Sequence, residues 1–418
     1  MLKRRQLLQS SALAASMFGL PLSASTSKPP APLPDPKLRQ SDPEKYWRRI
    51  REEQFLLPNW RSFLNNGSLG VAPRPVVKTV TDFIVSSAGL EMDWYPRWGY
   101  ETMDEHRQEL ADFYGCTKDE LALTHNATEA LSMLANGIDL KDGDEVLLTD
   151  QEHPSGRGPW QLRAARHPIT LREVKIPTPP KDPGQLADLM VSSIGPKTRV
   201  LAFSGIMSPT GYIMPVKEIC TAARAKDVIT IVDGAHMHGQ IPFRIDDLNA
   251  DYVVGSPHKW AYAPAGCGLL YIREENLDRL WPTICTGSWN QKELKAARFM
   301  GFGTNNRAIM EGLIAGLRFL KDLGPEAVYA RIHTLAKHYC ERAAKSKHVE
   351  LLTPMDDRMF GSLVAIRFKS DKLDAFHEVL KKKRIWVNMA KQIRLSAHIH
   401  TRPQDIDQYF EIMDQTLA

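Results

Sequence analysis

Short apolar runs alternate with helix-like segments through the middle of this 418-residue chain, and no other feature of the sequence constrains the fold as much. Strands separated by helical crossovers form a mainly parallel sheet that helices cover on both faces, so the pattern predicts an α/β domain. The last run follows the one before it too closely for a helical crossover, and we expect that strand to run antiparallel. The candidate strands are Leu121–Thr124, Glu145–Thr149, Arg199–Phe203, Val228–Val232, Asp251–Gly255 and Gly268–Arg273.

The pattern changes at about residue 305, where two long helical segments begin a second region. They span Ala308–Leu323 and Gly324–Ala344, and shorter strand-like runs follow at Leu363–Phe368 and Ile393–Ser396. This mixture predicts a smaller C-terminal α+β domain. Near the other end of the chain, Glu44–Trp60 is charged and amphipathic, which predicts a helix that packs on either domain.

The first 25 residues have the composition of an export signal. Basic residues at positions 3–5 precede an apolar run at 13–22 that is too short to span a bilayer, and small residues follow at 23–25. The pair Arg4-Arg5, followed by Gln6-Leu7-Leu8, resembles a twin-arginine signal, which exports proteins that are already folded around their cofactor. A disordered basic terminus is the alternative. The signal predicts a periplasmic or cell-envelope protein without stable membrane association once the signal is removed.

Charge and cysteine usage narrow the class of protein further. The formal net charge of +5 falls to about +2 without the three basic residues of the signal, which gives no case for nucleic acid as a partner. The five cysteines lie far apart without zinc-ligand spacing, so we expect neither a metal site nor a disulfide framework.

Ser27–Lys37 holds five prolines and predicts an extended linker. The predicted organisation is a signal at 1–25, a proline-rich linker at 26–43, an N-terminal segment that packs on the domains at 44–65, a large domain at 66–304 and a small C-terminal domain at 305–418.

Polar residues follow several of the predicted strands, at the edge where open α/β sheets bind ligands. After the first strand, Asn126-Ala127-Thr128 begins a helix whose free N–H groups and dipole would bind a phosphate, with the Thr128 hydroxyl as a further donor. An ordinary N-cap role for Asn126 or Thr128 is the alternative. His153 lies in the loop after the second strand, where it is either a surface residue or a ring that stacks on an aromatic cofactor.

Two further strand ends carry an acid and an amine. Asp233 ends a nearly all-apolar strand, where a carboxylate is costly unless it is paired, and either a pyridinium nitrogen or loop amides would be suitable partners. Lys259 follows the next strand among small and aromatic residues, which would lower the pKa of its amine and make it a nucleophile for Schiff-base formation. Ser256 and His258 flank it as candidate phosphate donors, and a surface lysine is the alternative.

These motifs, in this order, resemble those of the class V aminotransferase family, which includes isopenicillin N epimerases and cysteine desulfurases. The resemblance is closest to the isopenicillin N epimerase-like branch, and it runs from about Phe63 to the C-terminus. It implies the pyridoxal 5′-phosphate (PLP)-dependent transferase fold of type I, with a large, mainly parallel seven-stranded sheet domain and a smaller C-terminal α+β domain. The motifs are Asn126-Ala127-Thr128-Glu129-Ala130, Glu152-His153, Asp233-Gly234-Ala235-His236, Ser256-Pro257-His258-Lys259-Trp260 and the opening segment at 63–76.

The resemblance assigns roles around PLP, the cofactor it implies. Lys259 would bond covalently to PLP and later move the substrate α-proton. Asp233 would pair with the pyridine nitrogen, His236 would lie near the ring's phenolic oxygen, and His153 would stack on the ring. The phosphate would be held by the amides of Ala127 and Thr128 together with Ser256 and His258.

Other matching positions concern the substrate and a second subunit. Arg394 matches the arginine that binds the substrate α-carboxylate by a bidentate pairing, and Asn66 in the opening segment is expected to bind substrate as well. Thr304 matches a segment that reaches the phosphate of the neighbouring subunit, so the resemblance implies a homodimer. The family's usual ring-contacting asparagine is not obvious, and Ser208 is the candidate replacement. No metal is expected at the site.

The expected activity is PLP-dependent chemistry at the α-carbon of an amino acid or an amino-acid-derived substrate, by transamination or epimerisation. A PLP-dependent lyase that cleaves a C–S or other β-bond is the alternative. A catalytically inert exported binding protein is the alternative from another class, and the joint presence of Lys259, Asp233 and Arg394 argues against it. A nucleotide-binding oxidoreductase is disfavoured because no Gly-x-Gly-x-x-Gly motif follows the first strands. A cysteine desulfurase is not expected, because residues 383–394 lack the cysteine that would act as its nucleophile.

Overall fold

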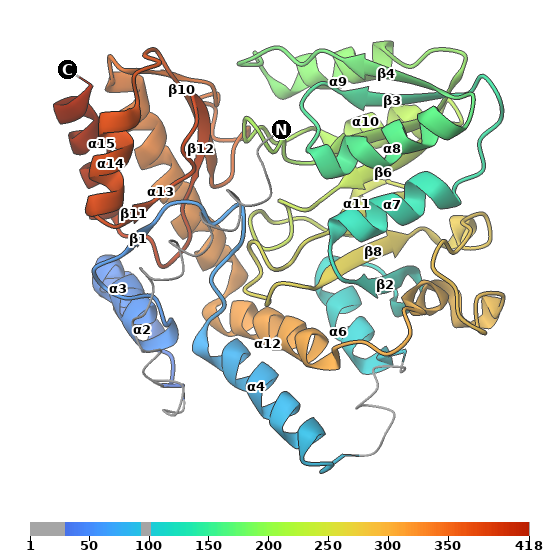
Figure 1. The fold of residues 1–418 in the computed structure, drawn as a ribbon, viewed down its shortest axis with the longest axis horizontal. Coiled ribbons are helices and arrows are strands. Elements are labelled where there is room, and N and C mark those ends of the chain that lie inside the picture. Colours follow the sequence, from blue (N-terminus) through green and yellow to red (C-terminus); the bar gives the residue numbers. More distant parts are fainter. Residues whose placement is uncertain (1–29, 93–101, 418) are drawn as a thin grey trace, which may run out of the picture.

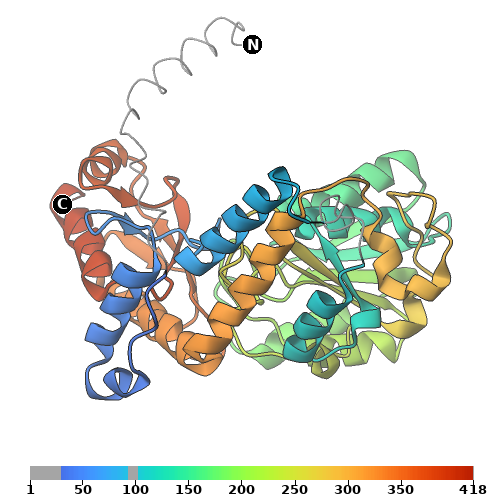
Figure 2. The same cartoon turned by 90° about the horizontal axis from the view of Figure 1, so that it is seen from below.

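A seven-stranded sheet and a three-stranded sheet organise the computed structural model, which describes residues 30–92 and 102–417 (Figure 1). The larger sheet belongs to the middle of the chain, and the smaller one to the C-terminal part on the other side of the molecule. Seen from below, helices α4 (Arg74–Ala88) and α12 (Arg307–Leu323) lie side by side between the two parts (Figure 2). In the described ranges, no helix has both the length and the apolar character that a membrane span requires. The predicted signal at 1–25 lies outside the described residues.

The larger sheet has the strand order β2-β8-β7-β6-β5-β3-β4, and β8 runs antiparallel to both of its neighbours. The predicted α/β class with a mainly parallel sheet is therefore confirmed, as is the direction of this strand. The sequence pattern missed β4, because an edge strand with mostly exposed or half-exposed side chains carries no apolar run. The strands are β2 Leu121–Thr124, β3 Glu145–Thr149, β4 Thr170–Val174, β5 Thr198–Ser204, β6 Ile229–Asp233, β7 Tyr252–Gly255 and β8 Gly268–Ile272.

The two faces of this sheet bury different side chains, because successive residues of a strand point in opposite directions. In β3, Val146 and Leu148 pack in one hydrophobic cluster and Leu147 packs in the other. Helices α7 and α8 cover the first face, whereas α6, α9, α10 and α12 cover the second. With both faces covered, the ends of the strands are the places open to a ligand. The helices are α6 Asp104–Tyr114, α7 Ala127–Gly137, α8 Pro154–Arg166, α9 Pro183–Ser192, α10 Val216–Arg224 and α11 Ile245–Leu248.

The C-terminal part folds around an antiparallel sheet of strand order β12-β10-β9. Helices α13, α14 and α15 pack on it in one hydrophobic cluster, as expected for a smaller α+β unit. The N-terminal segment joins this part, because its short strand β1 pairs in parallel with β11. The elements are β1 Ser62–Phe63, α13 Pro325–Lys345, β9 Val349–Leu351, β10 Leu363–Phe368, α14 Asp374–Lys382, β11 Ile385–Trp386, β12 Gln392–Ser396 and α15 Pro403–Thr416, with short 3-10 helices at Lys118–Glu120, Glu274–Asn276 and Lys292–Met300.

From residue 30 onward, two helices precede β1, where the sequence predicts an extended linker followed by one longer helix. Helix α2 (Pro36–Ser41) begins inside the proline-rich stretch, because Asp35 caps it and proline suits the first helical position. Helix α3 (Pro43–Gln54) ends before the predicted end at Trp60, since the chain becomes extended at Phe55. Its apolar face packs against α12, α13 and a tyrosine of the large domain. The N-terminal segment therefore contacts both parts of the molecule.

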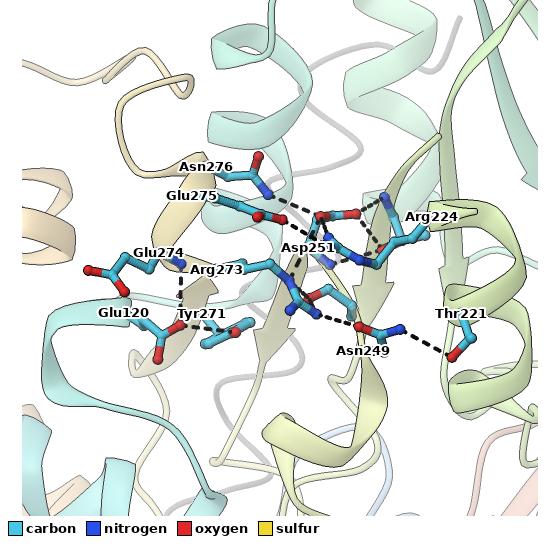
Figure 3. A network of polar contacts seen from close by, with 12 residues as sticks. Glu120, Thr221, Arg224, Asn249, Asp251, Tyr271, Arg273, Glu274, Glu275 and Asn276 are labelled. Carbon is cyan, nitrogen blue, oxygen red and sulfur yellow. Dashed lines mark hydrogen bonds and ion pairs between the residues drawn. The ribbon is translucent and has the colours of Figure 1, made fainter. Parts of the chain in front are cut away.

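A buried ionic network holds the amino-terminal ends of β6 and β7, at the opposite end of these strands from the predicted site residues (Figure 3). Asp251, just before β7, accepts hydrogen bonds from Thr230 N and Thr230 Oγ1, both at 2.8 Å. Its other oxygen accepts from Arg224 of α10 and, at 3.1 Å, from Asn276 Nδ2. Because Asp251 is 5% exposed, these bonds supply the partners that a buried carboxylate needs. The network therefore fixes the sheet without taking part in the site.

Candidate active site

A cavity of about 240 Å³ opens at the carboxyl ends of β2, β3, β5, β6 and β7. Loops that follow different strands meet there, which is where open α/β sheets bind ligands. Most of the predicted site residues line this cavity, and Ser208 lines it too; Asn66 and Thr304 do not. The predicted residues that the cavity brings together are Ala127, Thr128, His153, Asp233, His236, Ser256, His258, Lys259 and Arg394.

Lys259 lies just beyond β7, in a turn that buries most of its side chain. Its Nζ is 3.3 Å from His236 Nε2. Burial lowers the pKa of the amine to about 8, with Asp233 acting against this effect and Arg394 adding to it. An amine with this pKa is partly unprotonated near neutral pH, so it is available as a nucleophile.

The backbone around Lys259 is held by hydrogen bonds from distant segments of the chain. The carbonyl oxygens of residues 258, 259 and 260 accept, in that order, from Gly70 N at 2.9 Å, Asn66 Nδ2 at 2.7 Å and His398 Nε2 at 3.0 Å. Two of these donors precede the large sheet in the sequence and one belongs to the C-terminal part. The lysine is therefore positioned by the whole fold and not by its own loop alone.

Asn66 does not line the cavity, although the sequence predicts that it binds substrate. It is fully buried, its Nδ2 binds the Lys259 carbonyl, and its Oδ1 lies 3.3 Å from His400 Nε2. Both ends of the amide are thus used inside the protein. This geometry corrects the expectation of a substrate contact: Asn66 is a positioning residue for Lys259.

Asp233 ends β6 inside the cavity and is 7% exposed. Its Oδ1 accepts a hydrogen bond from Ala235 N at 2.9 Å, so a loop amide is one of its partners, as the alternative hypothesis has it. The negative charge of Asp233 raises the pKa of Lys259 and of His153, against the stronger lowering effect of burial on both. The carboxylate therefore acts electrostatically on two other residues that line the cavity.

A second buried acid, Glu152, lies beside Asp233, and no role for it is evident from the sequence. Its Oε1 accepts from Thr149 Oγ1 at 2.5 Å and from Ser204 N at 3.2 Å, and its Oε2 accepts from Ser204 Oγ at 2.6 Å. Burial and the nearby charge of Asp233 raise the pKa of Glu152 to about 7, although these hydrogen bonds act in the opposite direction. The signal in the sequence is an acid directly before His153, in the loop after β3.

His153 is the N-cap of α8 and also lines the cavity. Its Nδ1 accepts a hydrogen bond from Ser155 N at 3.2 Å. Burial and the charge of Lys259 lower the pKa of the ring, which favours its neutral form. The structure thus places a largely neutral imidazole at the cavity, with one nitrogen bound to the start of the helix. Such a ring suits stacking on a flat ligand.

The amino-terminus of α7 forms the predicted phosphate turn. Asn126 is its N-cap and accepts from Glu129 N at 2.9 Å, which is the structural role that the alternative hypothesis gives it. Ala127 N donates to Ser256 Oγ at 3.3 Å, so two segments predicted to bind phosphate meet directly. Thr128 is exposed at the edge of the cavity. Helix amides and a hydroxyl together form a donor set that suits a phosphate.

The sequence predicts that His258 donates a hydrogen bond to a phosphate, and the structure gives its ring a different role. Its Nδ1 lies 3.0 Å from the carbonyl of Cys267, and a carbonyl only accepts, so Nδ1 carries the hydrogen. Burial lowers the pKa of His258, which favours the neutral ring. A neutral His258 presents a lone pair at Nε2, and it donates to a phosphate only after taking up a proton.

Arg394 extends from β12 of the small sheet into the cavity. Its Nη1 donates to Ser208 O at 2.8 Å and also to the Ser208 hydroxyl, and its Nη2 donates to Gly67 O at 3.3 Å. Burial lowers the pKa of the guanidinium to about 10, which leaves it charged at neutral pH. Ser208 therefore orients Arg394, and because Ser208 also lines the cavity, the ring contact suggested by the sequence remains a prediction.

Thr304 is exposed in the loop before α12 and does not line the cavity of its own chain. Two residues earlier in the same loop, Phe302 packs on His125, with ring centroids 4.8 Å apart. This contact places the loop near the phosphate turn of α7. A contact between Thr304 and the phosphate of a neighbouring subunit remains a prediction.

The donors and acceptors of this cavity fit PLP, a flat molecule with a phosphate, a ring nitrogen and an aldehyde. The amides of α7 suit the phosphate, Asp233 suits a protonated ring nitrogen, and the Lys259 amine suits the aldehyde. Arg394 then remains for a substrate carboxylate. Across residues 30–92 and 102–417, no three or more His, Cys, Asp or Glu side chains are grouped in a way that could hold a metal ion.

Comparison with known proteins agrees with the conclusion that the cavity fits PLP. A family model described as Aminotransferase class-V matches residues 64–407. The isopenicillin N epimerase of Streptomyces clavuligerus is 32% identical over 390 residues, covering 88% of this chain and 98% of that protein. Probable cysteine desulfurase 2 of Mycobacterium leprae is 28% identical over 329 residues, covering 73% and 76%. The solved structure of the cystine C–S lyase C-DES with its reaction product cysteine persulfide is similar with a TM-score of 0.75 at 25% identity, covering 85% of this chain and 97% of that chain.

Proposed function

The chain belongs to the aminotransferase class-V family, whose cofactor is PLP, and from this premise we propose that it acts at the α-carbon of an amino acid or an amino-acid-derived substrate by transamination or epimerisation. One observation carries the proposal: a buried amine, a carboxylate and an arginine, namely Lys259, Asp233 and Arg394, line one cavity. The similarity to isopenicillin N epimerase over most of both chains supports chemistry at an α-carbon.

The residues of the chain have separate tasks in this chemistry. PLP, when bound, withdraws electrons from the substrate and so acidifies its α-carbon. Arg394 binds the substrate carboxylate through paired N–H groups and thereby orients the α-carbon. Lys259 Nζ would hold the cofactor, and it would accept the substrate α-proton and return it. Asp233 would keep a proton at the ring nitrogen, since a carboxylate beside that nitrogen would favour its protonated form.

A screen of amino acids separates the two reactions. The purified holoenzyme is incubated with L- and D-amino acids, and the products are identified by chiral chromatography and mass spectrometry. Transamination gives a 2-oxo acid, whereas epimerisation gives the other enantiomer at unchanged mass. We expect one of these products from at least one α-amino carboxylate. The absence of both products, with the cofactor fully bound, would contradict the proposal.

A second candidate function is β-elimination at a C–S bond. The structural similarity to the cystine C–S lyase C-DES favours it. In the same screen, elimination from cystine would release cysteine persulfide and elimination from cysteine would release sulfide, in each case together with a 2-oxo acid and ammonia. Ammonia in step with the 2-oxo acid would identify this reaction, because transamination releases none.

We also propose that the protein is not a cysteine desulfurase, although a probable desulfurase is among its relatives. Residues 383–394 contain no cysteine, and Cys340, the nearest one upstream, is buried in α13. Burial raises the pKa of Cys340 to about 12, so its thiol is a poor nucleophile. Incubation with cysteine should therefore give no enzyme-bound persulfide. A persulfide trapped by alkylation at catalytic rates would overturn this proposal; free sulfide would not, because β-elimination also produces it.

Export and dimer formation complete the proposal. We propose that the signal at 1–25 directs the folded protein to the periplasm or cell envelope, supported by the sequence pattern around Arg4 and Arg5. Replacing both arginines by lysine should keep the precursor in the cytosol, and unchanged secretion would contradict the signal.

A homodimer is proposed because Thr304 lies outside the cavity of its own chain. Sedimentation of a monomer with full cofactor occupancy would contradict it. Limited proteolysis tests the predicted boundaries of the large domain, between residues 65 and 66 and between residues 304 and 305.

A further inference from the structure

The residue after Lys259 is a tryptophan whose indole nitrogen contacts a histidine of the cavity. Trp260 is fully buried, and its Nε1 is 3.2 Å from His236 Nδ1. An indole N–H donates and never accepts, so His236 Nδ1 is the acceptor of this bond. Burial, together with the charges of Lys259 and Arg394, lowers the pKa of His236 well below its usual value, so the ring is neutral. A neutral ring with a lone pair at Nδ1 carries its hydrogen at Nε2.

His236 Nε2 faces two other nitrogen atoms of the cavity. It lies 3.3 Å from Lys259 Nζ and 3.4 Å from Arg394 Nη1. A guanidinium has donors only, so Arg394 cannot accept a hydrogen from Nε2. Three nitrogen atoms that carry hydrogens therefore converge on one region. Such an arrangement fits a negatively charged oxygen of a ligand.

We propose that Trp260 is a positioning residue that fixes the tautomer of His236, so that the ring donates a hydrogen from Nε2 to the phenolic oxygen of bound PLP. The identity of the ligand rests on the proposed function, whereas the tautomer follows from contacts within the protein. The other neutral tautomer would oppose two N–H groups at Trp260 and would present a lone pair to the ligand oxygen. Trp260 thus decides whether His236 attracts or repels that oxygen.

Trp260 is itself held so that its N–H cannot turn away from His236. Its ring stacks on His398, with centroids 5.9 Å apart and 25° between the ring planes. Its carbonyl accepts a hydrogen bond from His398 Nε2 at 3.0 Å. A Cβ built on Gly239 would lie 2.6 Å from the carbonyl carbon of Trp260, so the chain is also packed closely from another side. The orientation of the indole is therefore set by segments outside the loop that carries it.

His258 provides an internal comparison, because its tautomer is set by a different partner. Its Nδ1 donates to the Cys267 carbonyl, so the neutral ring has its lone pair at Nε2. The two histidines thus present different atoms to one cavity, a hydrogen from His236 and a lone pair from His258. A change at Trp260 should alter the tautomer of His236 and leave that of His258 unchanged.

Nitrogen-15 NMR of protein labelled at its histidine side chains tests the tautomer directly. In the cofactor-free wild type we expect the hydrogen of His236 at Nε2 and that of His258 at Nδ1, with each signal assigned by its loss in His236→Gln or His258→Gln. Trp260→Phe keeps an aromatic ring on His398 but removes the N–H, so His236 should become a mixture of tautomers. A wild-type His236 with its hydrogen at Nδ1 would overturn the inference, even if Trp260→Phe does not fold.

The absorption spectrum of the bound cofactor gives a second readout. When the absorbance of the visible band is followed in a pH titration, the loss of a donor to the phenolic oxygen should raise the midpoint by about one pH unit in Trp260→Phe. This corresponds to a tenfold change in the proton affinity of the bound cofactor. Tyr262→Phe is the matched control, since this buried hydroxyl belongs to a ring that also contacts His398, at 4.7 Å between centroids. The control should leave the midpoint in place, and an equal shift in both variants would overturn the inference. If wild-type protein fails to bind PLP, the proposed function fails while the NMR result stands.

Discussion

Replacing Glu152 by glutamine should make the stability of the protein less dependent on pH. In the folded protein burial and Asp233 raise the pKa of Glu152 from 4.5 to about 7. An acid with a raised pKa holds its proton more tightly in the folded state than in the unfolded state. As the pH rises from 4.5, the unfolded chain releases this proton and the folded protein keeps it, so the wild type loses stability until the pH passes about 7.

The size of the effect follows from the same shift. Each pKa unit corresponds to about 1.4 kcal/mol, so the full change between the two ends of this pH range is about 3 kcal/mol. Glutamine cannot ionise, although it alters the hydrogen bonds from Thr149 and Ser204 by an amount that does not depend on pH. The free energy of unfolding of Glu152→Gln should therefore rise relative to that of the wild type by about 3 kcal/mol between about pH 4.5 and about pH 8.

Urea unfolding of the cofactor-free protein, followed by tryptophan fluorescence across this pH range, measures the difference. Glu341→Gln is the matched control, because Glu341 is exposed on α13, and its difference from the wild type should stay constant. A constant difference for Glu152→Gln as well would refute the reasoning. It would mean that Glu152 is ionised throughout and that its hydrogen bonds outweigh its burial.

Two further predictions concern the sheet and the substrate. Asp251→Ala should lower the free energy of unfolding by about 3–5 kcal/mol, because it leaves Arg224 and Thr230 without their buried partner. Asp246→Ala removes an exposed ion pair and should lower the free energy of unfolding by less than about 1 kcal/mol. Urea unfolding compares the two, and equal losses would show that the network of Figure 3 has no special importance. Arg394→Lys should raise KM for the amino acid roughly tenfold with a smaller change in kcat, because an ammonium cannot form the bidentate pair. Steady-state kinetics measures this, and an unchanged KM would remove Arg394 from carboxylate binding.

The large sheet could be predicted because buried parallel strands require continuous apolar runs. The polar residues at the end of β6 and shortly after β7 could be predicted for the same reason, since they stand out against those runs. Edge strand β4 lacks such a run, and helix α2 depends on a cap at Asp35 within a stretch rich in proline. Local pattern alone does not separate these segments from loops.

Roles that depend on tertiary partners could not be predicted from the sequence. Glu152 resembles any acid in a loop until the fold brings Ser204, 52 residues away, against its carboxylate. Asn66 was expected to bind substrate, but its amide binds the Lys259 carbonyl, 193 residues away. Ser208 likewise became a partner of an arginine only when the small sheet was placed against the large one. Each of these residues has a side chain whose partner lies in a different strand or domain.

Locating the attachment of the cofactor tests the central claim most directly. Holoenzyme reduced with borohydride and digested should yield one pyridoxyl-modified peptide, with the modification on Lys259, whose Nζ lies in the cavity beside His236. Lys259→Ala should fold, as judged by circular dichroism, and give no modified peptide. A pyridoxyl group on another lysine of the wild type, or no modification of protein that contains PLP, would contradict the account.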